Sequence, residues 1–259
     1  MDDLAGLPAI DLDSLNATAE LLVRTDRKYV VPQHDLRGLL RGLPGLRVLE
    51  IDGRRASTYE STYFDTTELT SWAASAHPRR RRWKVRTRVY ADTGECWLEV
   101  KTRGGRGETV KERMPYDASS RDDIGDEAAM WLSARLGAGG SVRINVHGLV
   151  PTLRTSYQRS TILLPDGAGR ATIDRRLVWS SPFGRAALDA ASVVESKTPP
   201  GAAGPLDRHM WGLGHRPRRI SKYGTGLALL TPELPANRWH RVITRDLAAN
   251  LTITRDIPA

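Results

Sequence analysis

The segment Arg79-Arg-Arg-Arg-Trp-Lys-Val-Arg-Thr-Arg-Val-Tyr90 is the most informative stretch of the sequence. Its second half alternates strictly, with cations on one side of an extended chain and β-branched residues on the other: Lys84, Arg86 and Arg88 against Val85, Thr87 and Val89. Successive side chains of a β-strand point to opposite faces, and β-branched residues favour strands. The segment therefore predicts a strand with a cationic face. The arginines at its start, residues 79–82, are expected to form a solvated charge run.

The same alternation recurs at residues 24–28, 97–103, 109–113, 170–176 and 193–197. Each charged face mixes lysine or arginine with a few carboxylates. A flat sheet with one wet face would produce this pattern, and so would a closed barrel with a polar lumen and a packed outside. A lumen lined in this way would hold a polyanion and a divalent metal ion together.

The composition points to an anionic partner without choosing one. The 259 residues include 39 Lys or Arg and 30 Asp or Glu, giving a formal charge of +9. Such a balance favours nucleic acid, phosphates or a membrane surface. The single cysteine, Cys96, excludes an internal disulfide and a zinc site built from cysteines. The N-terminus is acidic and no run of about 18 apolar residues occurs, so we expect a cytoplasmic protein without a membrane span.

Hydrophobic spacing predicts helices at residues 35–43, 68–76, 120–137 and 207–213. Four strands are expected between the second helix and Tyr116, with later strands near residues 151–164, 171–179 and 190–197. Residues 218–226 are expected to be a loop or an irregular strand. No long linker divides the sequence, so residues 1–259 are predicted to be a single domain, with a core at about 21–230 and a C-terminal tail at 231–259.

An ordered set of short motifs connects these strands to a known family. The motifs are Asp26-Arg-Lys28-Tyr29, Tyr63-Phe-Asp65, Arg86-Thr-Arg88-Val-Tyr90, Glu99-Val-Lys101-Thr102, Lys111-Glu-Arg113, Arg154-Thr-Ser-Tyr157-Gln-Arg159, Glu195-Ser-Lys197 and Ser221-Lys222-Tyr223. Each is weak alone, but the order is fairly specific. Over about residues 21–230 the sequence resembles the polyphosphate polymerase (VTC) domain, a branch of the triphosphate tunnel metalloenzymes that also include the CYTH proteins.

The resemblance implies an α+β fold: an antiparallel eight-stranded β tunnel, or closed barrel, with a polar, basic lumen and flanking helices. It implies transfer of the γ-phosphate of ATP onto a growing inorganic polyphosphate chain, with release of ADP. The partners would be ATP and polyphosphate, and the cofactor Mn²⁺ or Mg²⁺. Because no membrane span is expected here, a membrane-protein partner is possible. The sequence does not specify the oligomeric state.

The resemblance also implies site residues. Catalytic roles fall on Lys28, Arg86, Arg88, Lys197 and Lys222. Substrate-binding roles fall on Lys101, Lys111, Arg113, Tyr157, Arg159, Arg219 and Ser221. The metal would be held by Glu195, with Glu99 as a second carboxylate. These residue types suit the chemistry, because guanidinium groups match phosphate oxygens and phosphoryl transfer depends on positioning and charge neutralisation.

Several alternatives remain open at this level. A CYTH protein has two glutamates and a lysine at alternating positions, but here the face is Arg24, Asp26 and Lys28, which favours the polymerase branch. A triphosphate or polyphosphate hydrolase, or a non-catalytic polyphosphate sensor, would use the same tunnel. Glu99 is as well explained by an ion pair as by a metal, and Ser221 by turn chemistry. Nucleic-acid binding is disfavoured, because few aromatic residues share the charged faces.

Overall fold

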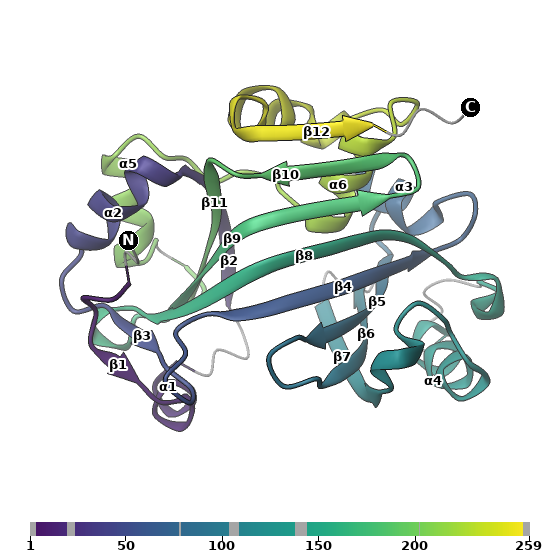
Figure 1. The fold of residues 1–259 in the computed structure, drawn as a ribbon, viewed down its shortest axis with the longest axis horizontal. Helices are drawn as coiled ribbons and strands as arrows, with labels where there is room; N and C mark the ends of the chain where they lie inside the picture. Colours follow the sequence, from purple (N-terminus) through teal and green to yellow (C-terminus); the bar gives the residue numbers. More distant parts are fainter. Residues whose placement is uncertain are drawn as a thin grey trace.

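The computed structural model describes residues 4–19, 24–77, 79–103, 109–137, 144–201 and 203–255. Its centre is a large, predominantly antiparallel sheet (Figure 1). The principal path follows eight strands in the order β2 (Thr25–Pro32), β11 (Ala191–Thr198), β9 (Arg170–Ser181), β8 (Val150–Leu163), β4 (Ser57–Asp65), β5 (Arg82–Tyr90), β6 (Cys96–Arg103) and β7 (Thr109–Tyr116). Four shorter strands extend it: β10 (Gly184–Leu188) and β12 (Leu251–Arg255) beside β9, and β1 (Ala9–Ile10) and β3 (Arg47–Leu49) beside β8.

The sheet does not close into the barrel that the sequence predicted. Among the described residues β2 pairs only with β11, and β7 only with β6, so two strand edges stay open. A cavity with cationic walls lies where the two strands begin, lined by Lys28 of β2, by Lys101 and Arg103 of β6, and by Thr109 of β7. Repulsion between these cations and their need for hydration oppose the close approach that hydrogen bonding between the edges requires.

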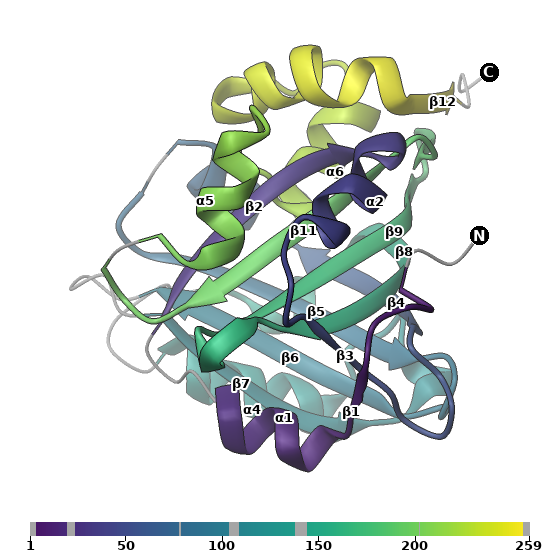
Figure 2. The ribbon, with the colours of Figure 1, turned by 90° about the vertical axis from the view of Figure 1, so that its left-hand side faces the viewer.

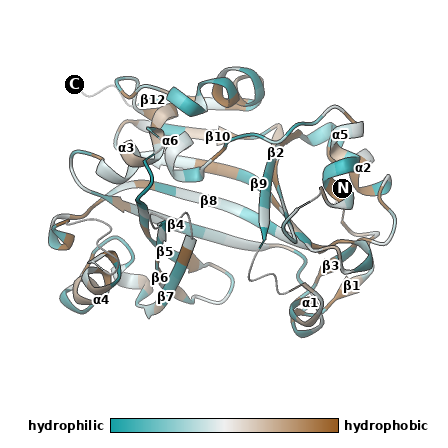
Figure 3. Ribbon diagram, turned by 180° about the vertical axis from the view of Figure 1, so that it is seen from behind, coloured by the Kyte–Doolittle hydropathy of each residue, from teal (hydrophilic) through white to brown (hydrophobic). Residues whose placement is uncertain are grey.

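Three helices cover one face of the sheet, and the charged residues lie on its other face. Helix α4 (Asp126–Gly137) packs Leu132 and its neighbours against Val85 and Leu98. At the other end, α2 (Gln33–Arg41) and α5 (Pro205–Gly212) form a second apolar cluster with β2, β11 and β9 (Figure 2). Seen from behind and coloured by hydropathy, the strands carry both hydrophilic and hydrophobic residues (Figure 3), as expected when one face packs and the other is polar.

Helix α6 (Lys222–Leu230) begins inside residues 218–226, the segment predicted to be a loop or irregular strand, so that prediction is wrong for residues 222–226. Ser221 starts the helix, because its Oγ accepts a hydrogen bond from the Gly224 N–H at 3.1 Å. The glycines that suggested a loop instead allow close packing. A Cβ on Gly226 would lie 2.2 Å from Trp179 Cδ1. The helix therefore packs tightly against the sheet and fixes where Ser221 and Lys222 lie.

The remaining elements complete this frame. Helix α1 (Leu12–Ala19) packs beside β3, and α3 (Thr70–Ala76) lies between β5 and α6. Three strands, rather than the expected four, lie between α3 and Tyr116. Strand β5 begins at Arg82, which is half-buried, so the exposed charge run predicted over residues 79–82 covers only Arg79–Arg81. No helix in the described ranges is both long and apolar enough to cross a membrane.

Candidate active site

Glu99 on β6 is the centre of the largest group of charges. Its side chain is 3% exposed. One carboxylate oxygen, Oε2, accepts from Arg86 Nε at 2.7 Å and lies 3.6 Å from the guanidinium of Arg88. The other, Oε1, accepts from Lys111 Nζ at 2.8 Å. Burial opposes the charge of Glu99, but Arg86 and Lys111 outweigh it and lower the pKa of this carboxyl. Three cations therefore share one carboxylate.

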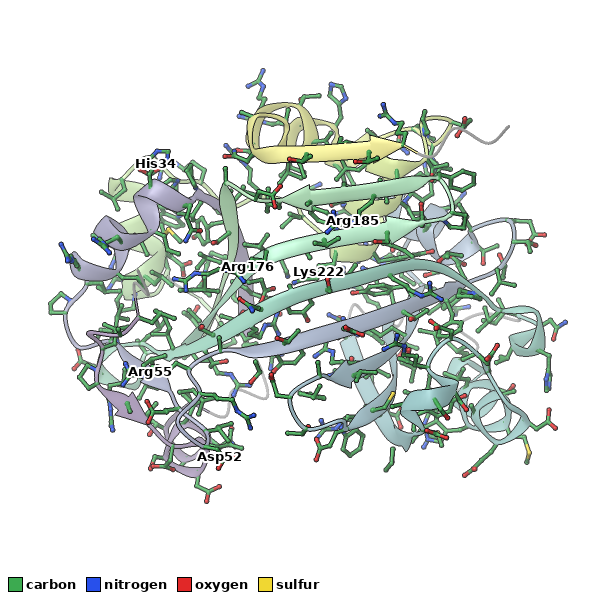
Figure 4. All side chains as sticks on the ribbon, in the orientation of Figure 1. His34, Asp52, Arg55, Arg176, Arg185 and Lys222 are labelled. Carbon is green, nitrogen blue, oxygen red and sulfur yellow. The ribbon has the colours of Figure 1, made fainter. Side chains whose placement is uncertain are left out.

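Asp174 on β9 holds a second pair of cations. Arg159 donates to both carboxylate oxygens, at 2.6 and 2.8 Å, and Lys222 donates to Oδ2. Burial opposes ionisation of Asp174, yet Arg159 and Lys222 lower its pKa to about 2. Lys222 lies against the inner side of β8 and β9 (Figure 4), with Nζ 4.2 Å from the centre of the Tyr157 ring. The N-terminus of α6 is thereby tied to the sheet.

Glu195 on β11 forms the third group. Its Oε1 lies 2.8 Å from Lys28 Nζ, and its Oε2 lies 3.1 Å from Lys197 Nζ. Strand pairing produces this arrangement, because Lys28 lies directly opposite Glu195 and Lys197 follows two residues later on the same face. Burial again opposes the charge, but the two lysines outweigh it and hold the pKa of Glu195 well below its usual range.

Arg88 is incompletely satisfied within these groups. Its side chain is 8% exposed, and its Nε has no hydrogen-bond acceptor among the described residues. The guanidinium also lies 5.4 Å from the centre of the Tyr59 ring, which stacks on Tyr157 at 5.4 Å. A buried N–H without an acceptor is costly, so this position favours an acceptor supplied by a ligand.

Tyr157 lies where the sheet is irregular. The register of β8 against β9 shifts between Ser156 and Gln158, and Arg176 on the opposite strand has a φ of +51°. Such bulges redirect side chains beside functional sites. Here the irregularity accompanies the packing of Tyr157 between Tyr59 and Lys222.

A cavity of about 550 Å³ opens beside these groups, between the two free edges of the sheet. Lys28, Lys84, Lys101 and Ser221 line it, together with several arginines. Lys84 Nζ donates to Ser221 Oγ at 2.9 Å. Burial lowers the pKa of Lys84 to about 7, with further lowering by the charges of Lys101 and Lys28.

The carboxylates of these groups can be compared with what a divalent metal ion needs. Within the described parts of the chain, no three Asp, Glu, His or Cys side chains gather in one group. A magnesium-type ion needs only one or two carboxylates when phosphates and water supply its other ligands. Glu195 fits this role better than Glu99. Each carboxylate oxygen of Glu195 contacts one lysine, and its side chain is 14% exposed, whereas the side chain of Glu99 is 3% exposed.

The predicted residues fall into three groups in the structure. Most join the networks around Glu99, Glu195 or Asp174, namely Lys28, Arg86, Arg88, Lys111, Tyr157, Arg159, Lys197 and Lys222. Lys101, Arg219 and Ser221 line the cavity. Arg113 lies apart, exposed and 4.2 Å from the centre of the Trp97 ring.

Sequence reasoning missed four residues that complete the site. Asp174 and Lys84 both lie in segments of alternating charge. They would have been found if every charged residue on the same face of those segments had been counted as a candidate. Tyr63, whose hydroxyl accepts from Arg86 at 3.0 Å, lies in a quoted motif, but its contact depends on strand pairing. Tyr59 lay outside the motifs and gave no signal in the sequence.

The chain is similar to several solved structures. A candidate adenylyl cyclase from Hippeastrum, described as having a dominant triphosphatase activity, is 16% identical with a TM-score of 0.45, covering 83% of this chain and 100% of that one. A protein from Pyrococcus horikoshii is 12% identical with a TM-score of 0.46, covering 80% and 98%. A candidate adenylate cyclase from Vibrio parahaemolyticus is 14% identical with a TM-score of 0.38, covering 91% and 94%. Such distant likenesses do not identify an activity.

No curated protein matches this sequence. The family model of the VTC domain, however, matches residues 23–231. This range is most of the chain and includes every group of charges described above. The chain therefore belongs to the VTC domain family.

Proposed function

We propose that this protein is a metal-dependent polyphosphate polymerase, which transfers the γ-phosphate of ATP onto a growing inorganic polyphosphate chain and releases ADP. The observation that carries the proposal is the surplus of positive charge around three largely buried carboxylates. Seven cations contact the three carboxylates Glu99, Asp174 and Glu195. A triphosphate would supply the missing negative charge and an acceptor for Arg88.

The residues act by binding and positioning. Arg86, Arg88 and Lys111 converge from neighbouring strands, and Arg159 and Lys222 face them from β8 and α6. In transfer, a terminal oxygen of the acceptor chain forms a bond to the γ-phosphorus as the bond between that phosphorus and the bridging β,γ-oxygen breaks. ADP leaves with the electron pair. The cations neutralise charge on the equatorial and leaving oxygens, and no covalent enzyme intermediate is required.

We assign the metal to Glu195, with Mn²⁺ or Mg²⁺ as the ion. Lys28 and Lys197 each contact one of its oxygens, and each lysine can contact a phosphate instead when the substrate enters. The bound ion would neutralise phosphate charge and orient the oxygens. Glu99 is assigned a different role, because two arginines and a lysine already surround it. It holds the cations in position before substrate binds.

The test is incubation of the purified protein with γ-labelled ATP and Mn²⁺, followed by separation on a polyphosphate gel. A ladder longer than triphosphate, with ADP produced in step, is expected. Free phosphate without chain growth would replace the proposal with a hydrolase. Tight polyphosphate binding without turnover would indicate a sensor.

Two variants locate the activity. Arg88→Ala and Lys197→Ala should each abolish synthesis while the protein remains folded, because each removes a buried cation from the phosphate path. Arg185→Ala, on the exposed part of β10, is the matched control (Figure 4). Wild-type turnover in either site variant, with folding confirmed by circular dichroism, would refute the site.

A further inference from the structure

Strand β12 is an edge strand, which borders the sheet beside β10 (Figure 1). It pairs with β10 over five residues without a bulge, from Leu251 opposite Leu188 to Arg255 opposite Gly184. Among the described residues, no other strand pairs with β12 and no further backbone group is hydrogen-bonded to it. Its second backbone edge is therefore available to a strand from outside this chain.

The sequence of β12 lacks the devices that usually block such pairing. Natural edge strands are protected by prolines, lysines, bulges or charges that point inward. Residues 251–255, Leu-Thr-Ile-Thr-Arg, contain no proline, lysine or carboxylate, and their one charge is on the last residue. The three central residues are β-branched and favour strands. The composition of β12 therefore favours pairing with another strand.

The two faces of β12 differ in their surroundings. Leu251 and Ile253 lie on the same face as Leu188 and Ala186, their partners in β10. Leu251 packs against the apolar cluster on that face, to which Leu188 and Ala186 belong. Ile253 remains 39% exposed although its partner Ala186 is buried. A further strand beside β12 would cover Ile253 and continue the apolar face.

Charges at the two ends of β12 are opposite in sign. At its start lies Asp189, which is exposed and whose backbone N–H donates to the Asn250 oxygen at 3.2 Å. At its end lie Arg255 and, on β10, Arg185 opposite Thr254; both arginines are exposed. An antiparallel copy of β12 would bring the acidic end of each chain to the basic end of the other. A parallel copy would instead bring like charges together.

We propose that β12 is a homodimer interface, in which it pairs antiparallel with β12 of a second copy of this chain about a twofold axis at Ile253. Residues directly opposite each other share a face, so this register keeps the apolar side continuous across both copies. It pairs all five residues: Ile253 with its own copy, Thr252 with Thr254, and Leu251 with Arg255. No like charges oppose each other, and β-branched pairs of this kind stabilise antiparallel sheets. The same patch serves both copies, as a twofold interface requires.

The first test is sedimentation velocity at protein concentrations from about 1 to 500 µM. A junction of five residues is small, so the wild type should dimerise weakly, with a dissociation constant of roughly 10–100 µM. Ile253→Lys should weaken the dimer at least about tenfold, because a lysine on the apolar side of an edge strand opposes pairing. The matched control is Ile51→Lys, which changes an isoleucine of similar exposure, 40%, outside β12. The control should dimerise like the wild type.

The register is tested by cross-linking. Ile253→Cys places one thiol of each copy beside the twofold axis, so a short bis-maleimide should link the two chains. Ile51→Cys should give no linked dimer, and the wild type should give none because its single cysteine, Cys96, is buried.

The direction of pairing is tested by exchanging charges. Asp189→Arg and Arg255→Glu should each weaken the dimer at low ionic strength, because each brings like charges together across the interface. The double variant should restore it, since opposite charges then meet again.

Four results would overturn the proposal: a wild type that stays monomeric at about 500 µM, a folded Ile253→Lys protein that dimerises as well as the wild type, equal cross-linking of Ile51→Cys and Ile253→Cys, or a double charge variant that is no better than the single ones. Thermal unfolding confirms that each variant is folded. Enzymatic activity is not a readout, so these results stand whether or not the protein polymerises phosphate.

Discussion

Replacing Glu99 by glutamine tests whether this carboxylate organises cations or binds metal. The substitution preserves the shape of the side chain and one oxygen acceptor, but removes the negative charge that faces Arg86, Arg88 and Lys111. If Glu99 organises cations, the unliganded protein loses stability. If it were a metal ligand, the main loss would be metal affinity. The same change at Glu195 should show the opposite pattern.

The size of the effect follows from burial. Removing one partner of a buried ion pair costs about 3–5 kcal/mol, because the remaining charges stay buried without compensation. Glutamine still accepts a hydrogen bond, so about 3 kcal/mol is expected. For a chain of this length, each kcal/mol shifts the unfolding midpoint by about 2–4 °C, and the variant should melt about 6–12 °C below the wild type.

Tripolyphosphate should reverse much of this loss. With Glu99 neutral, the surplus charge on the cations is larger, so the variant should bind a polyanion more tightly and gain more stability at a given ligand concentration. The assay is thermal unfolding with and without tripolyphosphate, together with Mn²⁺ titration of the Glu99→Gln and Glu195→Gln proteins. The reasoning is refuted if Glu99→Gln leaves the midpoint unchanged while weakening Mn²⁺ binding.

Three further predictions concern other parts of the site. Because burial and the charges of Lys101 and Lys28 lower the pKa of Lys84 to about 7, wild-type affinity for tripolyphosphate should fall as pH rises from 6 to 9. Lys84→Arg, which keeps its charge, should flatten that fall in calorimetric titrations, and parallel profiles would contradict the assignment. Because the pKa of Asp174 in the folded protein lies below its ordinary value of 3.8, its charge contributes stability that is present above that value and is lost as pH falls through about 2. Asp174→Asn should therefore lower the free energy of unfolding by about 2 kcal/mol at neutral pH, measured by urea unfolding. The variant should also lose less stability than the wild type between pH 4 and pH 2. Gly226→Ala should destabilise the protein by about 1–3 kcal/mol, because its Cβ would overlap Trp179; a thermal midpoint within 1 °C of wild type would show that α6 adjusts freely.

The alternation of charge predicted the strands and their polar face well, because a two-residue period is a local property of an extended chain. Arg86 and Arg88 lie on one face of β5, and Glu99 meets Arg86 across the ladder to β6. The order of the motifs also identified the family. These successes share one feature: each depends on residues close in sequence, or on the pairing of strands that follow one another.

The missed features depend on contacts that no local pattern encodes. Helix α6 contains two glycines that suggest a loop, and only its packing against Trp179 and Trp239 explains why small residues are needed there. Asp174 was assigned no role, yet its partners Arg159 and Lys222 come from other elements. Closure of the barrel would need β2 and β7 to pair although they are not consecutive strands, and the cations beside their edges oppose it.

The distribution of carboxylates explains how the chain carries so many cations and still folds. A buried cation without a counter-charge is costly, so the inner groups contain Glu99, Asp174 and Glu195 as internal compensation. A polyanion that enters the site would exchange one set of carboxylate contacts after another for phosphate contacts, so that no step leaves the buried cations unpaired.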